Sequence, residues 1–287
     1  MNVKTIKATV AILLILVIAG IGYFIYNIEN NSSLNLNSGN IFPSKLVDQP
    51  QKPEEEQINP EHFYCPVLLY HHIAKSKVQN SYYVSPEIFE EQMKWLKENN
   101  YHVISYDKFY QAASGEGTLP SKPVVITFDD SLLDQYTNAY PILRKYNYPA
   151  TFFVKLNDVS NKGTSALTFS EIKKMAENGM TIGSHSMNHD NMADMDTNTL
   201  YYELNQSKKV LEQNTGVKIK YFSYPGGAYS SSTVIATKNA GYLSAVTTKH
   251  KVFQEIKTPN SIFQIPRVHI DDEMPTFIDW VQGINLH

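Results

Sequence analysis

Two neighbouring carboxylates, Asp129 and Asp130, follow the β-branched run "VVITF" at residues 124–128. Two ionised acids side by side repel each other, so the pair suits a site where a cation neutralises one acid and leaves the other free to accept a proton. Asp and Ser are also common in solvated turns after strands, and the string "DDS" taken alone leaves both interpretations open. The choice between them depends on what else the chain brings to the same place.

Two histidines, His185 and His189, stand four residues apart in "SHSMNHD". This spacing lets two imidazoles meet one cation from a helical turn or a tight loop. With a carboxylate from Asp130 they offer two nitrogens and one oxygen, the ligand set of a catalytic Zn²⁺ that keeps a position open for water. Fe²⁺, Co²⁺ or Ni²⁺ would fit the same ligands. One acid of the pair would then bind the metal, and the other would take a proton from water that the cation activates.

These residues can meet only if the fold brings separate segments together. From residue 63 onward, short apolar strands alternate with helical segments, which is the pattern of parallel β/α architecture. The candidate strands are 66–70, 102–105, 123–128, 150–154, 180–184, 221–224, 243–247 and 264–270. These seven or eight β/α steps predict an α/β fold, a (β/α) barrel of regular or irregular shape rather than an open sheet. The candidate residues follow or end predicted strands, and the carboxyl ends of barrel strands share the face that carries the active site.

Sequence signals also mark where helices begin. Ser85 fits the N-cap of a helix over residues 86–100, where a proline takes the first position. Thr168 and Glu171 form a capping-box pattern at the start of a second helix. A third helix is predicted to begin near Asp196, with Leu200, Leu204 and Leu211 as its buried stripe.

The N-terminal part of the chain differs from the rest. Residues 8–26 contain no charged side chain and are long enough to cross a bilayer core of about 30 Å as a helix. Lys4 and Lys7 precede this segment, and no basic residue follows until Lys45, which predicts a cytoplasmic N-terminus and an extracytoplasmic remainder. A cleavable signal peptide is the alternative, but aromatic residues stand where its small-residue cleavage site would lie. We therefore expect an uncleaved signal anchor, with the remainder at the cell surface.

Three regions follow from composition. Residues 1–26 form the cytoplasmic tip and transmembrane anchor, residues 27–60 a polar linker predicted to be disordered, and residues 61–287 the catalytic domain. A net charge of -3 argues against nucleic acid as the main partner. Cys65 is the only cysteine, which excludes intramolecular disulfides and thiolate metal clusters.

Three motifs, "TFDD", "HSMNH" and "YPGG", occur in this order. On these motifs the chain resembles the metal-dependent polysaccharide deacetylases of carbohydrate esterase family 4 over residues 64–275, and "PVLLYHHI" resembles the branch with exopolysaccharide and peptidoglycan enzymes. The resemblance implies a distorted (β/α) barrel and a divalent metal, with Zn²⁺ expected first. It also implies Asp129 as the general base and Asp130, His185 and His189 as the metal ligands.

The third motif departs from the family pattern. Many members carry Arg-Pro-Pro-Tyr-Gly where this sequence reads Ser223-Tyr224-Pro225-Gly226-Gly227. The arginine that commonly steadies the base is absent, and Ser223 cannot supply its charge. The family's oxyanion contact comes partly from a backbone N–H, which Gly226 can still supply. We therefore group Tyr224, Pro225 and Gly226 as candidate substrate-binding and oxyanion residues.

The last predicted strand carries two further candidates. His269 has the order and strand-end position of the family's late histidine, which protonates the leaving amine, and a purely structural histidine is an equally open interpretation. Arg267 points to the same side of the strand and could pair with a carboxylate near the metal, in place of the missing arginine.

Other residues near the motifs receive weaker assignments. We favour no role for His71 or His72 beyond shaping the rim of the site. Tyr224, Tyr229 and Trp280 could offer faces on which sugars stack, but scattered aromatic residues more often belong to the core.

Taken with the resemblance, these features predict a monomeric, membrane-tethered hydrolase that removes N-acetyl groups from N-acetylglucosamine units of a cell-envelope or secreted glycan. Peptidoglycan and poly-N-acetylglucosamine are both open as substrates. One alternative is a catalytically weak glycan-binding module on the same barrel, which the altered third motif suggests. Another is an esterase or amidase for a small acetylated molecule, for which a membrane tether gives no reason. Retention of Asp129 and all three metal-ligand candidates favours the polysaccharide enzyme.

Overall fold

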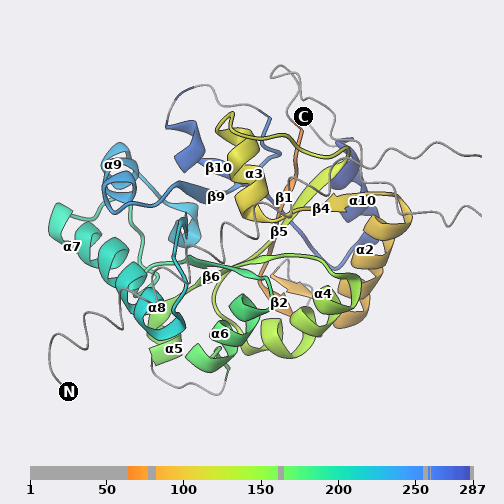
Figure 1. Ribbon diagram of the computed structural model, residues 1–287, viewed down its shortest axis with the longest axis horizontal. Helices are drawn as coiled ribbons and strands as arrows, with labels where there is room; N and C mark the ends of the chain where they lie inside the picture. Colours follow the sequence, from red (N-terminus) through yellow and green to blue (C-terminus); the bar gives the residue numbers. More distant parts are fainter. Residues whose placement is uncertain (1–63, 77–81, 161–164, 255–257, 259, 285–287) are drawn as a thin grey trace, which may run out of the picture. The chain divides into compact units, whose positions relative to one another are not determined.

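Parallel strands form the central sheet, and seven of them close into a barrel. The computed structural model describes residues 64–76, 82–160, 165–254, 258 and 260–284. The pairing of β1 with β5 closes the ring (Figure 1). In spatial order the barrel strands are β1 (Val67–Tyr70), β10 (Ile265–His269), β9 (Ser244–His250), β8 (Tyr221–Ser223), β7 (Thr181–Ser184), β6 (Thr151–Val154) and β5 (Pro123–Phe128).

All eight predicted strands are present, but one of them takes no part in closure. Strand β4 (His102–Val103) pairs with β5 alone among the described strands. The predicted α/β barrel of seven strands is therefore confirmed. Two short strands that the sequence did not predict, β2 (His72–Ile73) and β3 (Tyr83–Val84), pair with each other beyond the end of β1.

Helices lie around the strands (Figure 1), and the buried apolar side chains of all helices named below except α3 belong to one cluster with outward-facing strand residues. The helices are α2 (Pro86–Glu98), α3 (Tyr106–Ala113), α4 (Tyr140–Tyr146), α5 (Leu156–Ser160), α6 (Phe169–Glu177), α7 (Thr197–Tyr201), α8 (Ser207–Thr215), α9 (Ser231–Asn239) and α10 (Met274–Gln282), with π-helical turns at η2 (Gln135–Ala139) and η3 (Tyr202–Gln206).

The predicted helix starts are confirmed by their caps. The Ser85 side chain accepts a hydrogen bond from the Ile88 N–H at the start of α2. Thr168 and Glu171 form the predicted capping box of α6. Asp196 caps α7, and the predicted third helix continues through η3 into α8. The π-helical turn within it was not expected, because no local sequence signal distinguishes such a turn from an α-helix.

The inside of the barrel changes character along its axis. Val125 on β5 and Ile265 on β10 belong to an apolar inner cluster, which α3 extends at the amino-terminal end of the strands. Further along the same faces, the side chains become polar at Thr127, Asp129 and Arg267, all of which are buried. Side chains alternate between the two faces of a strand, so residues two apart continue the same inner surface. The strands thus lead from an apolar lower core to a polar upper end.

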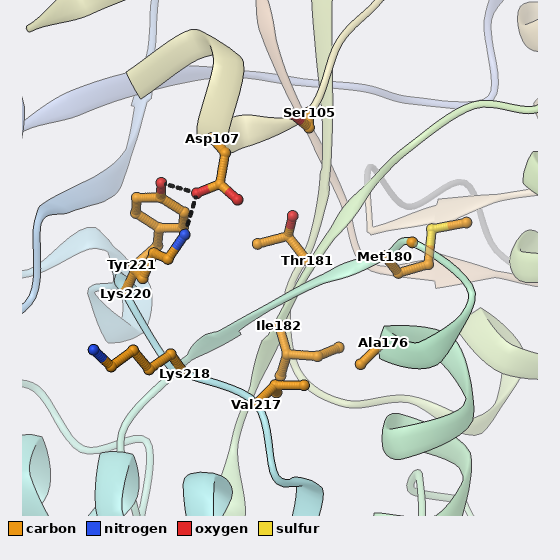
Figure 2. Close-up of a pocket in the computed structure, with 11 residues that line it drawn as sticks. Ser105, Asp107, Ala176, Met180, Thr181, Ile182, Val217, Lys218, Lys220 and Tyr221 are labelled. Atoms are coloured by element: carbon orange, nitrogen blue, oxygen red, sulfur yellow. Dashed lines mark hydrogen bonds and ion pairs between the residues drawn. The ribbon is translucent and has the colours of Figure 1, made fainter. Parts of the chain in front are cut away.

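The lower end contains a pocket of about 370 Å³ between α3, α6 and the starts of β7 and β8 (Figure 2). Strands β7 and β8 pair only at Ser184 and Phe222, near their carboxyl ends. This irregular pairing is one reason why the barrel is distorted. Asp107 in the pocket wall is already paired, because it accepts hydrogen bonds from Lys220 Nζ and from the Tyr221 hydroxyl.

No helix among the described residues is long and apolar enough to cross a membrane. The predicted anchor at residues 8–26 and the predicted linker at residues 27–60 lie outside the described residues. Both therefore stay predictions.

Candidate active site

The carboxyl ends of four barrel strands bring the candidate residues together, as the barrel prediction required. Asp129 and Asp130 follow β5, and His185 and His189 follow β7. The third motif follows β8, while the candidates of the last strand lie within β10. Segments that are far apart in sequence therefore form one site.

Three of these residues form a compact metal-ligand set. Asp130 Oδ1 lies 3.6 Å from His185 Nε2 and 3.3 Å from His189 Nε2. One potential ligand atom from each of the three residues lies within 4.8 Å of the others. Asp130 Oδ1 is buried and has no hydrogen-bond partner among the described residues. A divalent cation between these atoms would satisfy that oxygen, so the residues present fit a metal.

A backbone contact fixes how one of the two imidazoles faces this centre. His185 is buried, and its Nδ1 lies 2.7 Å from the carbonyl oxygen of Ser223 on β8. A carbonyl only accepts, so Nδ1 carries the proton and Nε2 keeps its lone pair toward Asp130. The contact with the Ser223 carbonyl therefore gives His185 the tautomer that a metal ligand needs.

The loops that carry the ligands adopt unusual backbone angles. Asp130 and Ser131 after β5 have φ values of 77° and 58°, and Ser186 and His189 after β7 have φ values of 68° and 67°. Left-handed angles are unfavourable for residues with a side chain, and they concentrate at functional sites where the surroundings enforce them. Ser131 shows how this is done, since its Oγ accepts a hydrogen bond from the Lys155 N–H at 2.7 Å.

Asp129 sits beside the ligand set but is held by different partners. Arg267 donates to both of its oxygens, from Nη1 at 2.8 Å and from Nη2 at 2.6 Å. Ser223 Oγ donates to the same carboxylate at 2.9 Å. Burial raises the pKa of Asp129, but the Arg267 guanidinium, together with the neighbouring His185 and His71, holds that pKa well below its usual range. Asp129 is therefore ionised, and it is the buried carboxylate that can accept a proton next to the metal-ligand set.

Comparison with known proteins agrees with this arrangement. The family model for polysaccharide deacetylases matches residues 116–245. The chain is 33% identical over 211 residues to YxkH of Bacillus subtilis, a protein assigned to the polysaccharide deacetylases, covering 72% of this chain and 74% of that protein. The chain belongs to the polysaccharide deacetylase family. Deacetylases of this family depend on a metal, which agrees with the Asp-His-His set.

Two further relatives of this deacetylase are informative. It is 31% identical over 213 residues to the poly-β-1,6-N-acetyl-D-glucosamine N-deacetylase of Staphylococcus aureus, covering 70% of this chain and 72% of that protein. Its fold is similar to that of the Streptococcus pyogenes deacetylase PplD in complex with acetate, with a TM-score of 0.70 and 26% identity over 77% of this chain and 99% of that one.

Arg267 reaches this deacetylase's buried acid from β10, as the alternation along that strand had suggested. Its Nε also donates to the Thr247 carbonyl at 3.0 Å, and its Nη1 donates to Thr127 Oγ1 at 3.1 Å. The side chain is completely buried. A guanidinium thus meets Asp129 although the third motif lacks its arginine, and Ser223 at that motif contributes a hydroxyl instead of a charge.

His269 lies at the rim together with two residues that the sequence analysis left aside. The His71 and His269 rings are 5.2 Å apart, and the Tyr82 ring lies 4.7 Å from His71 and 5.2 Å from His269. His71 Nδ1 and His269 Nε2 are buried without a hydrogen-bond partner among the described residues. Burial lowers the pKa of His71 to about 4, against the opposing charges of Asp129 and Asp130. Burial, His250 and Arg267 lower the pKa of His269 as well.

The sequence analysis favoured no role for His71 beyond shaping the rim, and the structure brings it to the site. It continues the inner face of β1 two residues after Leu69, so strand alternation alone could have placed it inside the barrel mouth. His72 points elsewhere, because its Nδ1 pairs with Asp134 at 2.6 Å and its ring stacks on Tyr83.

The aromatic residues suggested as sugar-stacking faces differ in how exposed their side chains are. Tyr224 is completely buried against Phe222 and Tyr229, so its ring cannot stack on a sugar, and that suggestion was wrong. Tyr229 and Trp280 are partly buried and pack against the core. Tyr82, beside the rim histidines, is about half exposed at 51%.

The remaining third-motif residues form a tight turn. Pro225 is buried and begins a short 3₁₀ turn, and Gly226 adopts a left-handed φ of 57° that glycine tolerates. Gly226 is exposed on this turn. Its backbone N–H stays the candidate oxyanion contact.

Proposed function

We propose that this deacetylase removes N-acetyl groups from N-acetylglucosamine units of a secreted or cell-envelope polysaccharide, with a poly-β-1,6-N-acetylglucosamine polymer as the first candidate. The ionised, buried Asp129 beside the Asp130–His185–His189 set carries the proposal, because it combines a base with a metal site. The similarity to the Staphylococcus aureus enzyme supports the choice of polymer.

Each residue then has a distinct task. A divalent cation held by Asp130, His185 and His189, Zn²⁺ first, with Co²⁺, Ni²⁺ or Fe²⁺ as alternatives, would supply Lewis-acid activation of water and of the acetamide carbonyl. Asp129 accepts the proton of the attacking water on a lone pair that Arg267 leaves free. The Gly226 N–H donates to the oxygen on which negative charge develops.

The leaving amine needs a proton, and His269 is our candidate to give it. His71 lies beside it with an unpartnered nitrogen, but burial lowers its pKa to about 4, so His71 is neutral and is not the acid. An acetate ester of 4-nitrophenol has a leaving group that needs no protonation. Replacing the histidine that protonates the amine by Ala should therefore lower the rate of amide hydrolysis by about 10²–10⁴-fold and the rate of ester hydrolysis far less. A His269→Ala variant with equal losses on both substrates would remove His269 from this role.

The location of the enzyme is also part of the proposal. Residues 8–26 anchor the chain in the membrane, and residues 27–60 hold the catalytic domain, residues 61–287, away from its outer surface. The apolar length and the lysines before it support this topology. Mass spectrometry of the native protein should find the N-terminal segment still attached. A new N-terminus near residues 20–35 would replace the anchor by a cleaved signal peptide.

Acetate release by residues 61–287 tests the function most simply. Poly-β-1,6-N-acetylglucosamine, peptidoglycan and chito-oligosaccharides are offered side by side, with and without a chelator. We expect chelator-sensitive release that is fastest on the first polymer. Binding without release would favour a glycan-binding module, and release from small acetyl esters alone would favour the small-molecule enzyme.

A further inference from the structure

The loop that joins the two metal-ligand histidines is held from both sides. On one side, its carbonyls accept hydrogen bonds from the start of α5, with Leu156 N–H to Ser186 O at 3.2 Å and Asn157 N–H to Met187 O at 2.8 Å. Within the loop, the His189 N–H donates to Ser186 Oγ at 2.9 Å. These contacts engage the carbonyls but leave the amides of Met187 and Asn188 in need of an acceptor.

Glu203, in the π-helical turn η3, supplies that acceptor. Its Oε2 accepts from the Met187 N–H at 2.9 Å and from the Asn188 N–H at 3.1 Å. Its Oε1 accepts from Asn188 Nδ2 at 2.7 Å. Glu203 is only 1% exposed, and no lysine, arginine or histidine among the described residues forms an ion pair with it. A buried carboxylate is costly unless hydrogen bonds compensate, so these three contacts with the loop account for its presence.

The loop needs this support because its shape is unfavourable by itself. Ser186 and His189 both hold left-handed φ angles, and each such angle costs on the order of 1 kcal/mol or more. Without Glu203, the two amides would lose their acceptor, and the loop would relax toward more ordinary angles. That relaxation would move His189, which lies at the far end of the loop, whereas His185 directly follows β7.

We propose that Glu203 is a positioning residue that sets the metal affinity of the site by holding the His185–His189 loop in its ligand-ready shape. It touches no ligand atom and acts through the backbone amides of Met187 and Asn188. The inference rests on the proposed metal site, and it assigns a task to a helix that the reaction scheme does not otherwise use.

Glu212 provides a matched control on the same helical segment. It lies on α8 and accepts, through Oε1, a hydrogen bond from the Ile219 N–H at 3.0 Å. Like Glu203, it accepts from a backbone N–H, but it is only partly buried, and the loop it supports precedes β8 at the lower end of the barrel. A general loss of helix or loop stability would therefore affect both variants, whereas a loss of metal-loop geometry would affect Glu203 alone.

The test measures Zn²⁺ affinity by competition with a chromophoric chelator, together with hydrogen exchange of the Met187 and Asn188 amides in the metal-free protein. Glu203→Ala should weaken Zn²⁺ binding by about 10–100-fold, as expected for a residue that orients metal ligands. Exchange of the two amides should accelerate. Glu203→Gln should lose much less Zn²⁺ affinity. The glutamine side-chain oxygen can accept both backbone hydrogen bonds, while the Asn188 side-chain amide flips so that its oxygen faces the new NH₂ group. Glu212→Ala should bind Zn²⁺ like the unmodified protein.

The outcomes separate this inference from the proposed function. An unmodified protein that binds no divalent metal would overturn the metal site and the inference with it. Normal binding by the unmodified protein and by Glu203→Ala would overturn the inference alone. Equal losses in Glu203→Ala and Glu212→Ala would also overturn it. If Glu203→Ala does not fold, Glu203→Asp decides, because it keeps the charge but withdraws the carboxylate by one methylene, and unchanged affinity there would contradict the proposal.

Discussion

The two ends of the barrel are built from the same strands, but they differ in whether their polar groups are paired with one another. At the lower end, Asp107 is paired with Lys220 and Tyr221 across the pocket of Figure 2. At the upper end, Asp130 Oδ1 and His71 Nδ1 are buried and have no hydrogen-bond partner among the described residues. Buried polar atoms without partners are costly, and they persist where an outside group completes them. The comparison shows that a polar pocket becomes a candidate site only when its polar groups are not already satisfied by one another.

One buried ion pair marks the boundary between the two ends. Arg267 lies 5.6 Å over the ring of Phe153, which belongs to the apolar inner cluster, and its guanidinium reaches up to Asp129. The lower core therefore contacts the guanidinium through the Phe153 ring, while the guanidinium nitrogens donate to Asp129 at the upper end. This division makes Arg267 the residue whose loss should disturb both ends together.

Arg267→Met is expected to have the largest effect on stability and on acetate release. It would leave the Asp129 carboxylate buried without its counter-ion, which typically destabilises a fold by about 3–5 kcal/mol. The pKa of Asp129 would rise because burial would be opposed less strongly, and acetate release would fall. Denaturant unfolding and acetate release measure the two effects.

The double variant Arg267→Met with Asp129→Asn is the control for that prediction. It removes both charges, so it should recover much of the lost stability while remaining inactive. A double variant that is as unstable as the single one would show that Arg267 acts through packing alone, and the proposed division between the two ends would fail.

A smaller effect on stability is expected at the upper end when the pH is lowered. His71 has a pKa lowered to about 4 by burial, so it stays neutral in the fold while its unfolded form takes a proton near pH 6.5. The unfolded state therefore binds more protons between these values, and the stability of the metal-free protein should decrease as the pH falls from about 6.5 to about 4. His71→Gln should make this decrease shallower. His102→Gln, at the lower end, is the matched control, and an identical slope in both variants would contradict the assignment.

The smallest effect is expected at the lower end. Asp107 and Lys220 are both more than a third exposed on their side chains, so solvent weakens their interaction. Asp107→Asn should therefore cost no more than about 1 kcal/mol and leave acetate release unchanged. Thermal unfolding and turnover measure this. A strong loss of activity would mean that the lower pocket communicates with the site, contrary to the separation described here.

Much of the site could be predicted because it depends on local signals and one general rule. Asp129, Asp130, His185 and His189 follow apolar strands, and barrel strands bring their carboxyl ends to one face. Arg267 could be suggested because side chains alternate along β10. The same period explains the error at Tyr224, which continues the outer face of Phe222 and is therefore covered by helices.

Other features could not be predicted because they depend on distant partners. The exclusion of β4 follows from the pairing of β1 with β5, which leaves no signal in either strand. Glu203 looks like any exposed acid of an amphipathic helix, and only the loop after β7 explains its burial. Sequence periodicity reports which face a residue occupies, but not which loop comes to lie against that face.

The most direct test of the central claim compares Asp129→Asn with Asp130→Asn, with metal content by elemental analysis and acetate release measured on the same samples. The account predicts that Asp129→Asn keeps its metal and loses about 10²–10⁴ in rate, the usual contribution of a positioned base. It predicts that Asp130→Asn loses metal, because an amide oxygen is a poorer ligand than a carboxylate. Metal loss in Asp129→Asn with retention in Asp130→Asn would reverse the two roles. Full metal and full rate in both variants would contradict the site altogether.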